Sequence, residues 1–316
     1  MPAQIIDGKA IAAKVRERVR ERVSELARDG IKPCLAVLLV GEAPASNVYV
    51  GMKQRAADAA GIKAIDRRLP ASATQEEILA ILDEWNADPS VHGILVQLPL
   101  PDQVDERTVM ERLRPEKDVD GFHPVNVGRM TSGDPDAFRP CTPAGVQVLL
   151  EHIGYDPSGK HAVIVGRSNI VGRPMAAILS QKEAYANATV TIAHSRTADL
   201  GAVTRLADVL IVAIGRPEAV TADMVSEGTV VIDVGVNRVD DPSTPKGYRL
   251  VGDVDYDGVR EKASWITPVP GGVGPMTIAM LLSNTAAAAA RQGAGTGSRS
   301  GARLGARSGS QLSAGS

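Results

Sequence analysis

Apolar residues recur along most of the chain with two periods, one typical of helices and one of buried strands. Spacings of three and four at residues 11–26 and 78–85 predict amphipathic helices. Short apolar runs predict strands at 35–40 and 93–97, and a weaker strand at 65–69. Because these strands alternate with helices, the N-terminal part of the chain is predicted to form parallel βαβ units.

The same alternation returns after a polar stretch between residues 118 and 143. That stretch shows no regular period, and an irregular loop of this length is expected to be functional. A helix at 144–153 follows it, and then come four strands rich in Val and Ile, predicted at 161–165, 189–193, 208–214 and 229–234. Because helical segments separate these strands, the region is predicted to form a Rossmann-like parallel sheet.

The whole pattern predicts an α/β protein of two domains with a C-terminal tail. Residues 1–143 form the first domain and residues 144–274 the second, and Pro275 begins a last helix that runs to about residue 291. Residues 293–316 contain seven Gly, six Ser and three Arg but no acidic residue. Such a segment buries too little apolar surface to offset its ordering entropy, so it is predicted to be disordered.

Composition excludes several classes of protein. Hydrophobic residues make up 44% of the chain and aromatic residues only 3%, so the core is expected to consist of Ala, Val, Leu and Ile. A net charge of −2 gives no sign of a nucleic-acid-binding or polybasic membrane surface. Two cysteines, Cys34 and Cys141, are too few for a disulfide framework or a zinc cluster, and no metal is expected. Since no signal peptide and no apolar run of roughly 18 residues is evident, the protein is predicted to be cytoplasmic.

A candidate phosphate cradle follows the strand predicted at 161–165. Gly166, Arg167 and Ser168 lead through Gly172 into a helix, so backbone N–H groups and the helix dipole point at a bound anion. Ser168 stands where the usual dinucleotide motif has its middle glycine. The glycine pair alone is therefore equally compatible with a plain tight turn.

The end of the next strand favours NADP over NAD as the cofactor. An NAD-binding fold carries an acidic residue there for the ribose hydroxyls, but this chain has His194, Ser195 and Arg196. Arg196 and Ser195, with Arg167, are suited to a 2′-phosphate; the alternative is that the two arginines are solvated surface charges. Two further strand ends carry Gly215 and Val236, which are expected beside the ribose and nicotinamide unless they only form turns.

Candidate acid–base residues lie in the first domain. Tyr49 and Lys53 are four residues apart on a predicted helix and so share a face, a spacing that surface pairs also show. Gln97 ends a strand, and Asp120 follows in the polar stretch. Because the loops of a parallel sheet converge at one edge, these groups are predicted to share a cleft, where desolvation lowers the lysine pKa.

A loop rich in proline and glycine precedes the last helix. Residues 268–275 hold three Pro and three Gly, which together fix an unusual backbone path and allow close approach of a ligand. Pro270, Gly271 and Gly272 are therefore candidate substrate-binding residues.

Four runs of the sequence resemble one enzyme family, at residues 96–101, 117–121, 165–168 and 268–275. This family is the bifunctional methylenetetrahydrofolate dehydrogenase/methenyltetrahydrofolate cyclohydrolase, and the resemblance covers about residues 3–291. It implies two domains around a deep cleft, folate bound by the first and NADP by the second. It also implies a last helix that returns to the first domain, and a homodimer.

The resemblance also assigns roles to the candidate residues. Lys53 matches the catalytic lysine and Tyr49 the tyrosine of the pterin pocket. Gln97 matches the glutamine bonded to that lysine, and Asp120 the carboxylate that binds the pterin ring. The cofactor contacts match Gly166 to Ser168, Ser195 and Val236.

The implied activity is oxidation of 5,10-methylenetetrahydrofolate with NADP+, followed by hydrolysis of the methenyl product to 10-formyltetrahydrofolate. Four alternatives remain open at this point. They are a folate dehydrogenase without cyclohydrolase activity, an oxidoreductase acting on a shikimate-like acid, a non-catalytic folate-binding protein, and NAD as the cofactor.

Overall fold

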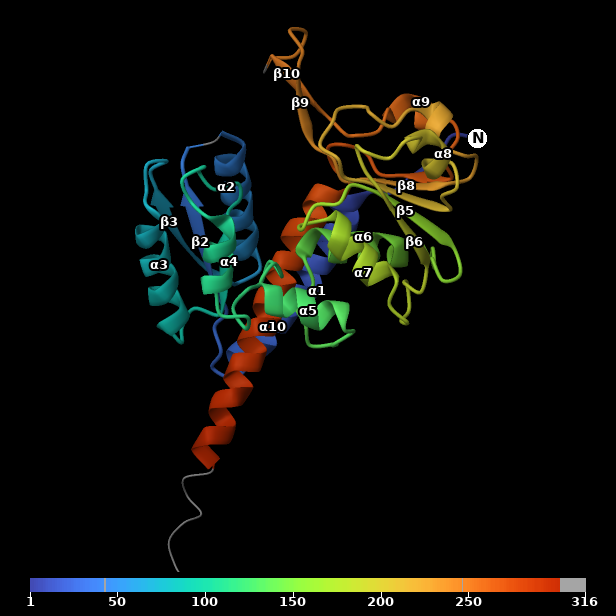
Figure 1. Ribbon diagram of the computed structural model, residues 1–316. Helices are drawn as coiled ribbons and strands as arrows, with labels where there is room; N and C mark the ends of the chain where they lie inside the picture. Colours follow the sequence, from blue (N-terminus) through green and yellow to red (C-terminus); the bar gives the residue numbers. More distant parts are fainter. Residues whose placement is uncertain (43, 246, 302–316) are drawn as a thin grey trace, which may run out of the picture.

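The computed structural model describes residues 1–42, 44–245 and 247–301 as two α/β lobes joined by two long helices (Figure 1). The smaller lobe contains a three-stranded sheet, and the larger lobe a six-stranded sheet. Helices α1 (Gly8–Arg28) and α10 (Val273–Gly301) run between the lobes and pack against each other. The domain boundary expected at residue 143 stays a prediction. The N-terminal strand β1 (Gln4–Ile5) pairs within the larger sheet, although the sequence placed residues 1–143 in the first domain.

The smaller sheet is parallel, with the order β3-β2-β4. Its strands are β2 (Cys34–Val40), β3 (Lys63–Leu69) and β4 (Gly93–Val96). Its helices are α2 (Pro44–Ala59), α3 (Gln75–Ala87) and α4 (Glu106–Arg112). Every residue of β2 is buried, because α2 and α10 cover one face of the strand and α3 and α4 the other. A capping box between Thr74 and Glu77 fixes the start of α3.

The larger sheet is also parallel, with the order β1-β11-β8-β7-β5-β6. Its other strands are β5 (His161–Val165), β6 (Thr189–Ala193), β7 (Val209–Val212), β8 (Val230–Asp233) and β11 (Trp265–Ile266). Helices α6 (Cys141–His152) and α7 (Gly172–Leu179) cover one face, and α8 (Leu200–Thr204) and α9 (Tyr256–Arg260) the other. The direction of winding reverses between β5 and β7, so a ligand crevice is expected at their carboxyl ends.

Several elements were not predicted from the sequence, among them the short strands β1 and β11 and the short helices α4 and α9. The polar stretch expected to be irregular contains helix α5 (Pro124–Thr131), which the His123 side chain caps. An antiparallel hairpin, β9 (Asn237–Asp240) and β10 (Tyr248–Val251), projects from the larger lobe (Figure 1). A short 3₁₀ helix, η1 (Ala222–Met224), also escaped prediction. These elements are too short or too polar to show a clear hydrophobic period.

Helix α10 extends further than predicted, into the segment expected to be the tail. The tail was expected from residue 293, but the helix continues to Gly301, because extending an existing helix requires only one new residue to be fixed per hydrogen bond. Residues 302–316 lie outside the described part of the chain. Residues 273–294 are long and apolar enough to span a membrane by length and composition, although no apolar run of that length was expected from the sequence. More than half of the most apolar window is buried, and α10 packs on α1 and α6 as a core helix does.

Candidate active site

A cavity of about 350 Å³ lies between the two lobes and contains the predicted acid–base residues. The smaller lobe contributes polar side chains to it, and the larger lobe contributes mostly apolar ones. The lining residues from the smaller lobe include Tyr49, Lys53, Gln97 and Asp120, and those from the larger lobe and α10 include Ile170, Val171, Val234, Val236, Val273 and Thr277. The structure therefore brings together four predicted catalytic residues and the predicted cofactor neighbour Val236.

Lys53 is held at the cavity wall by a hydrogen bond from its own ammonium group. Its side chain extends from α2, is only 7% exposed, and donates from Nζ to Oε1 of Gln97 at 3.0 Å. The Gln97 amide in turn donates from Nε2 to the Leu98 carbonyl at 2.7 Å, which fixes its oxygen towards the lysine. The bond joins a helix residue to a strand end 44 residues away, and it is the Lys53–Gln97 contact that the family resemblance implied.

Burial shifts the protonation of the charged groups at this wall. It lowers the pKa of Lys53, and the Asp120 carboxylate opposes that change. It raises the pKa of Asp120, and Lys53 opposes that change in turn. Burial, followed by the nearby Asp120, also raises the pKa of the Cys141 thiol well above its ordinary value. A lysine with a lowered pKa exchanges protons nearer to neutral pH than an exposed lysine, as acid–base catalysis requires.

The loop that presents Asp120 is organised by its neighbour Asp118. The Asp118 carboxylate is 1% exposed and accepts hydrogen bonds from the backbone N–H groups of Gly121, Phe122 and His123 and from the Asn126 amide. These donors close the loop around the carboxylate. Asp118 thus determines where Asp120 lies, although the sequence alone did not separate their roles.

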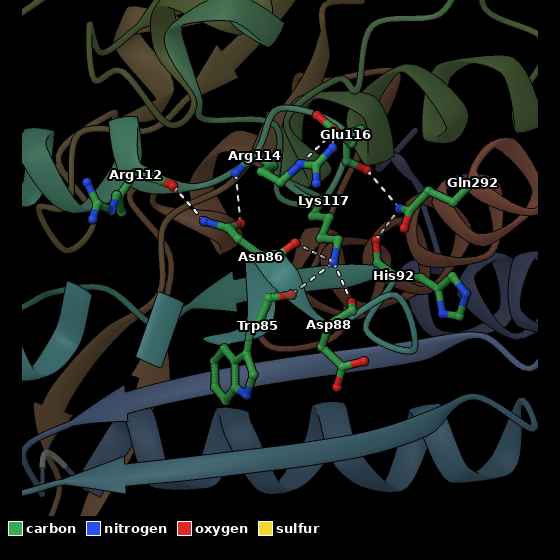
Figure 2. Close-up of polar contacts among 9 residues, drawn as sticks. All are labelled: Trp85, Asn86, Asp88, His92, Arg112, Arg114, Glu116, Lys117 and Gln292. Atoms are coloured by element: carbon green, nitrogen blue, oxygen red, sulfur yellow. Dashed lines mark hydrogen bonds and ion pairs between the residues drawn. The ribbon is translucent and has the colours of Figure 1, made fainter. Parts of the chain in front are cut away.

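Lys117, from the same sequence run, lies outside the cavity at the carboxyl end of α3 (Figure 2). Its Nζ donates to the backbone oxygens of Trp85, Asn86 and Asp88 at 2.9, 3.1 and 2.7 Å. These contacts use all three donors of the ammonium group and stabilise the last turn of the helix. Lys117 therefore supports the fold rather than the chemistry.

Two threonines in the cavity were not among the predicted site residues. Thr142 at the start of α6 and Thr277 on α10 share a hydrogen bond of 2.8 Å between their hydroxyl groups, and both line the cavity. Thr277 lies two residues after the proline–glycine run at 268–275, and this closeness could have marked it as a candidate site residue. Thr142 lies near the end of the polar stretch and belongs to no motif.

The proline–glycine segment contributes to the cavity through its last residues. Pro270 is exposed, and Gly272 is buried against Gly8 at the start of α1, where a side chain on Gly8 would overlap the Gly272 carbonyl. Val273 and Gly274 line the cavity instead. Pro270, Gly271 and Gly272 are not among its lining residues, and their role as substrate contacts stays a prediction.

The candidate phosphate cradle has the close packing that its glycines predict. Gly166 has a φ of +136°, and a Cβ there would overlap the carbonyl oxygen of Ala213. A Cβ on Gly172 would overlap the Gly166 carbonyl. The Ser168 hydroxyl accepts hydrogen bonds from the N–H groups of Val171, at 3.1 Å, and Gly172, at 3.3 Å, at the start of α7. Both glycines are buried in this packing, and residues 167–170 between them are the exposed part of the turn that a ligand can reach.

The predicted 2′-phosphate contacts follow adjacent strands. Val165 pairs with Ala193 at the ends of β5 and β6, and Arg167 and Ser195 each come two residues later. Arg167, Ser195 and Arg196 are all exposed at this edge. A dinucleotide with a 2′-phosphate fits such a pair of cations and a hydroxyl.

Two further predicted residues lie at the ends of β7 and β8. Gly215 has a φ of +66° with open space where a Cβ would stand, and its N–H donates to the Asp253 carboxylate at 2.8 Å. Val236 is 44% exposed and faces the cavity that holds Lys53. A cofactor along this edge would therefore reach the acid–base residues of the other lobe.

Comparison with known proteins identifies both halves of the chain. Residues 6–120 match the tetrahydrofolate dehydrogenase/cyclohydrolase catalytic domain, and residues 140–293 match the NAD(P)-binding domain of the same family. The bifunctional protein FolD of Moorella thermoacetica is 58% identical over 291 residues, which cover 92% of this chain and 100% of the relative.

Solved structures of similar proteins agree with this match. The bifunctional dehydrogenase/cyclohydrolase of Campylobacter jejuni is 50% identical, with a TM-score of 0.86 over 92% of this chain and 99% of that one. The enzyme of Trypanosoma brucei, solved with NADP and an inhibitor, is 40% identical, with a TM-score of 0.87 over 92% and 98% of the two chains.

Proposed function

This chain belongs to the tetrahydrofolate dehydrogenase/cyclohydrolase family, and on that premise we propose how its cavity divides the two reactions among its residues. The enzyme oxidises 5,10-methylenetetrahydrofolate with NADP+ and hydrolyses the methenyl product to 10-formyltetrahydrofolate. The family and the cofactor predicted from the sequence are thereby confirmed.

The dehydrogenase step depends on the approach of two ligands from opposite walls of the cavity. Bound NADP+ supplies a hydride acceptor at the edge formed by Gly166, Gly215 and Val236. The folate lies against Tyr49, with its pterin ring bonded to Asp120, because one carboxylate accepts two parallel N–H bonds from an aminopyrimidinone. Holding both ligands in one enclosed cavity removes much of the entropic cost of their encounter.

The cyclohydrolase step depends on Lys53. Water attacks the methenyl carbon, the new C–O bond forms, and the proton released from the water passes to Lys53 Nζ. The hydroxyl group on that carbon then loses its proton as the C=O bond forms, and the bond from the carbon to N5 breaks as N5 receives a proton. This leaves the formyl group on N10, with a net release of one proton. Gln97 holds Nζ in place, and the lowered pKa of Lys53 suits it to both transfers.

One observation supports this assignment above the others: Lys53 Nζ is buried, bonded to Gln97, and placed in a cavity that Val236 of the other lobe also lines. The test is a coupled assay with methylenetetrahydrofolate and NADP+, in which NADPH formation and decay of the methenyl intermediate are followed separately. Both signals are expected. Formation of NADPH with accumulation of the methenyl compound would instead indicate a dehydrogenase without cyclohydrolase activity.

We also propose the remaining sequence-based expectations. The protein is a cytoplasmic homodimer. It contacts the 2′-phosphate of NADP through Arg167, Ser195 and Arg196, and the substrate through residues 270–272. Light scattering on the full-length chain tests the dimer, and a monomer mass would contradict it. Relative rates with NADP+ and NAD+ test the cofactor contacts.

A further inference from the structure

Two buried carboxylates lie behind the cofactor edge, and neither has a role in the chemistry described above. Asp253, in the turn between β10 and α9, is 0% exposed, and Asp233, at the end of β8, is 3% exposed. Neither carboxylate is paired with a lysine or arginine in the described part of the chain; both are surrounded by N–H donors. Buried carboxylates in such a setting order the groups that donate to them.

Asp253 binds three successive backbone N–H groups of the loop that follows β7. Oδ2 accepts from Ile214 at 2.7 Å and from Gly215 at 2.8 Å, and Oδ1 accepts from Arg216 at 2.9 Å. These are charge-assisted bonds of normal length, and they converge on one carboxylate from a loop 37 to 39 residues away. The loop conformation, including the positive φ of Gly215, is therefore determined by a side chain outside the loop.

This loop lies where the sheet reverses its winding. Strands β5 and β7 are neighbours, the Ala213 N–H donates to the Val165 carbonyl at 2.8 Å, and Gly166 packs directly on the Ala213 carbonyl. Ligands of open α/β sheets bind in the crevice at such a reversal. Asp253 thus fixes the second side of the crevice, opposite the glycine turn at residues 166–172.

Asp253 also reaches the segment that carries Val236. Its Oδ1 accepts a hydrogen bond of 2.8 Å from Nδ2 of Asn237, the residue after Val236. Asn237 donates as well to the Gly252 carbonyl at 3.2 Å. One carboxylate therefore links the loop after β7 to the loop after β8, and both loops face the cofactor edge.

Asp233 holds the backbone of the turn that carries Asp253. Its carboxylate accepts from the backbone N–H groups of Asp253 and Val254, each at 3.0 Å, and from that of Gly235 at 3.0 Å. Gly235 and Gly252 leave room for this arrangement, since a Cβ on Gly235 would overlap the Asp253 carboxyl and one on Gly252 the Asp233 carboxyl. The space between β8 and the turn at residue 253 is thus filled by the two carboxylates and their donors.

We propose that Asp253 is the positioning residue for the cofactor: it sets the backbone of residues 214–216 and, through Asn237, the Val236 segment, against which NADP binds. This inference rests on the proposed function, because it assigns the crevice to the cofactor. Asp253 acts through the backbone it binds and touches neither reacting group. Its removal therefore weakens NADP binding and the dehydrogenase reaction but spares the cyclohydrolase reaction, which transfers no hydride.

The test compares Asp253→Asn with the wild-type chain and with a matched control, Asp257→Asn, which changes an exposed carboxylate on α9. An amide presents one acceptor oxygen and one NH₂ group, so at least one of the four donors loses its partner. NADPH affinity is measured by fluorescence titration, and the KM for NADP+ by steady-state kinetics. Cyclohydrolase activity is measured on the methenyl substrate without cofactor. Loss of a charge-assisted bond to a ligand-binding loop is expected to weaken NADPH affinity and raise the KM at least about tenfold.

The expected result is that rise together with a cyclohydrolase rate within about twofold of the wild type. A parallel fall of both activities would overturn the proposal, because it would show a general loss of structure. Unchanged NADPH affinity would also overturn it. A wild-type chain without either activity would instead contradict the proposed function itself.

A second variant keeps the test informative if Asp253→Asn does not fold. Asn237→Ala removes one neutral donor and leaves the carboxylate with three backbone donors, so the fold is expected to persist. NADPH affinity is expected to fall about threefold, with the cyclohydrolase rate unchanged. An NADPH affinity equal to that of the wild type would overturn the link between Asp253 and the Val236 segment.

Discussion

The two walls of the cavity use buried charge in opposite ways. On the smaller lobe, Lys53 and Asp120 line the cavity with titratable atoms. Burial lowers the pKa of Lys53 and raises that of Asp120, so it favours the neutral form of each. On the larger lobe, Asp233 and Asp253 lie behind the loops, and their oxygens bind backbone N–H groups. The smaller lobe therefore presents titratable side chains to the cavity, whereas the buried carboxylates of the larger lobe order its loops through backbone hydrogen bonds.

This difference follows from what each reaction requires of the protein. Hydrolysis of the methenyl carbon needs a group that gives and receives a proton, so a side chain must reach the substrate. Hydride transfer needs no proton carrier, because the cofactor supplies the chemistry and the protein supplies position. Buried carboxylates serve the second need by ordering loops from a distance.

The largest effect is expected from Lys53→Ala. The cyclohydrolase rate should fall about 10²- to 10⁴-fold, since this is the usual contribution of a positioned acid–base group. NADPH formation should fall much less, because hydride transfer does not pass through Nζ. The control is Lys63→Ala, which removes an exposed lysine of β3, and thermal unfolding checks the fold of both variants. Normal hydrolysis of the methenyl substrate by Lys53→Ala would show that this wall does not carry the chemistry.

The second effect concerns the pH dependence of stability at Asp233. Burial raises the pKa of Asp233 from 3.8 to about 7, so the folded chain holds this proton more tightly than the unfolded chain. The protonated carboxyl therefore adds stability that is complete below about pH 4 and is lost as the pH rises through about 7. The loss is of the order of 4 kcal/mol, from the difference between the two pKa values.

Urea unfolding of the wild type and of Asp233→Asn between pH 4 and pH 8 measures this effect. The free energy of unfolding of the wild type should fall relative to that of the variant as the pH rises. A rise instead would mean that the three N–H donors hold Asp233 charged in spite of burial, and the buried carboxylates would then both act as anions.

A somewhat smaller effect is expected from Gly166→Ala. The side chain would adopt a positive φ and overlap the Ala213 carbonyl, so the free energy of unfolding should fall by about 3 kcal/mol and NADP binding should weaken. Gly154→Ala is the matched control, because Gly154 also has a positive φ, +68°, but has open space around it. The free energy of unfolding in urea is compared for the two variants. Gly154→Ala reports the cost of the positive φ alone, and the further loss in Gly166→Ala reports the overlap with Ala213. Equal losses in the two variants would show that the cradle is not closely packed.

The smallest effect is expected from Arg196→Ser. This exposed cation should contribute about 1 kcal/mol to binding of the 2′-phosphate, so the preference for NADP+ over NAD+ in kcat/KM should fall about fivefold to tenfold. The control is Arg18→Ser, an exposed position on α1. If the preference is unchanged, the missing acid at residues 194–196, rather than the arginine, accounts for the choice of cofactor.

Local sequence determined much of this protein. The alternating periods predicted the three strands of the smaller sheet and β5, β6, β7 and β8 of the larger one, but not the two-residue strands β1 and β11. β5 and β6 were predicted at their observed bounds, since a buried parallel strand is a run of apolar residues wherever it occurs. Lys53 and Gln97 were also marked locally, by a helix face and a strand end, whereas Asp120 lay in the irregular stretch and the role of each came from the family resemblance. The missing acid beside Ser195 indicated NADP for the same local reason.

Tertiary structure alone decided how distant segments meet. Asp253 binds Gly215 across 38 residues, and Asn284 on α10 binds the Val119 carbonyl across 165, and no spacing in the sequence marks either contact. Likewise Lys117 and Asp120 stand in one short run, yet one stabilises a helix end and the other lines the cavity. Periodicity reports which face of an element is buried, but burial against a particular partner depends on how the packed elements exclude water, and only the folded chain fixes that.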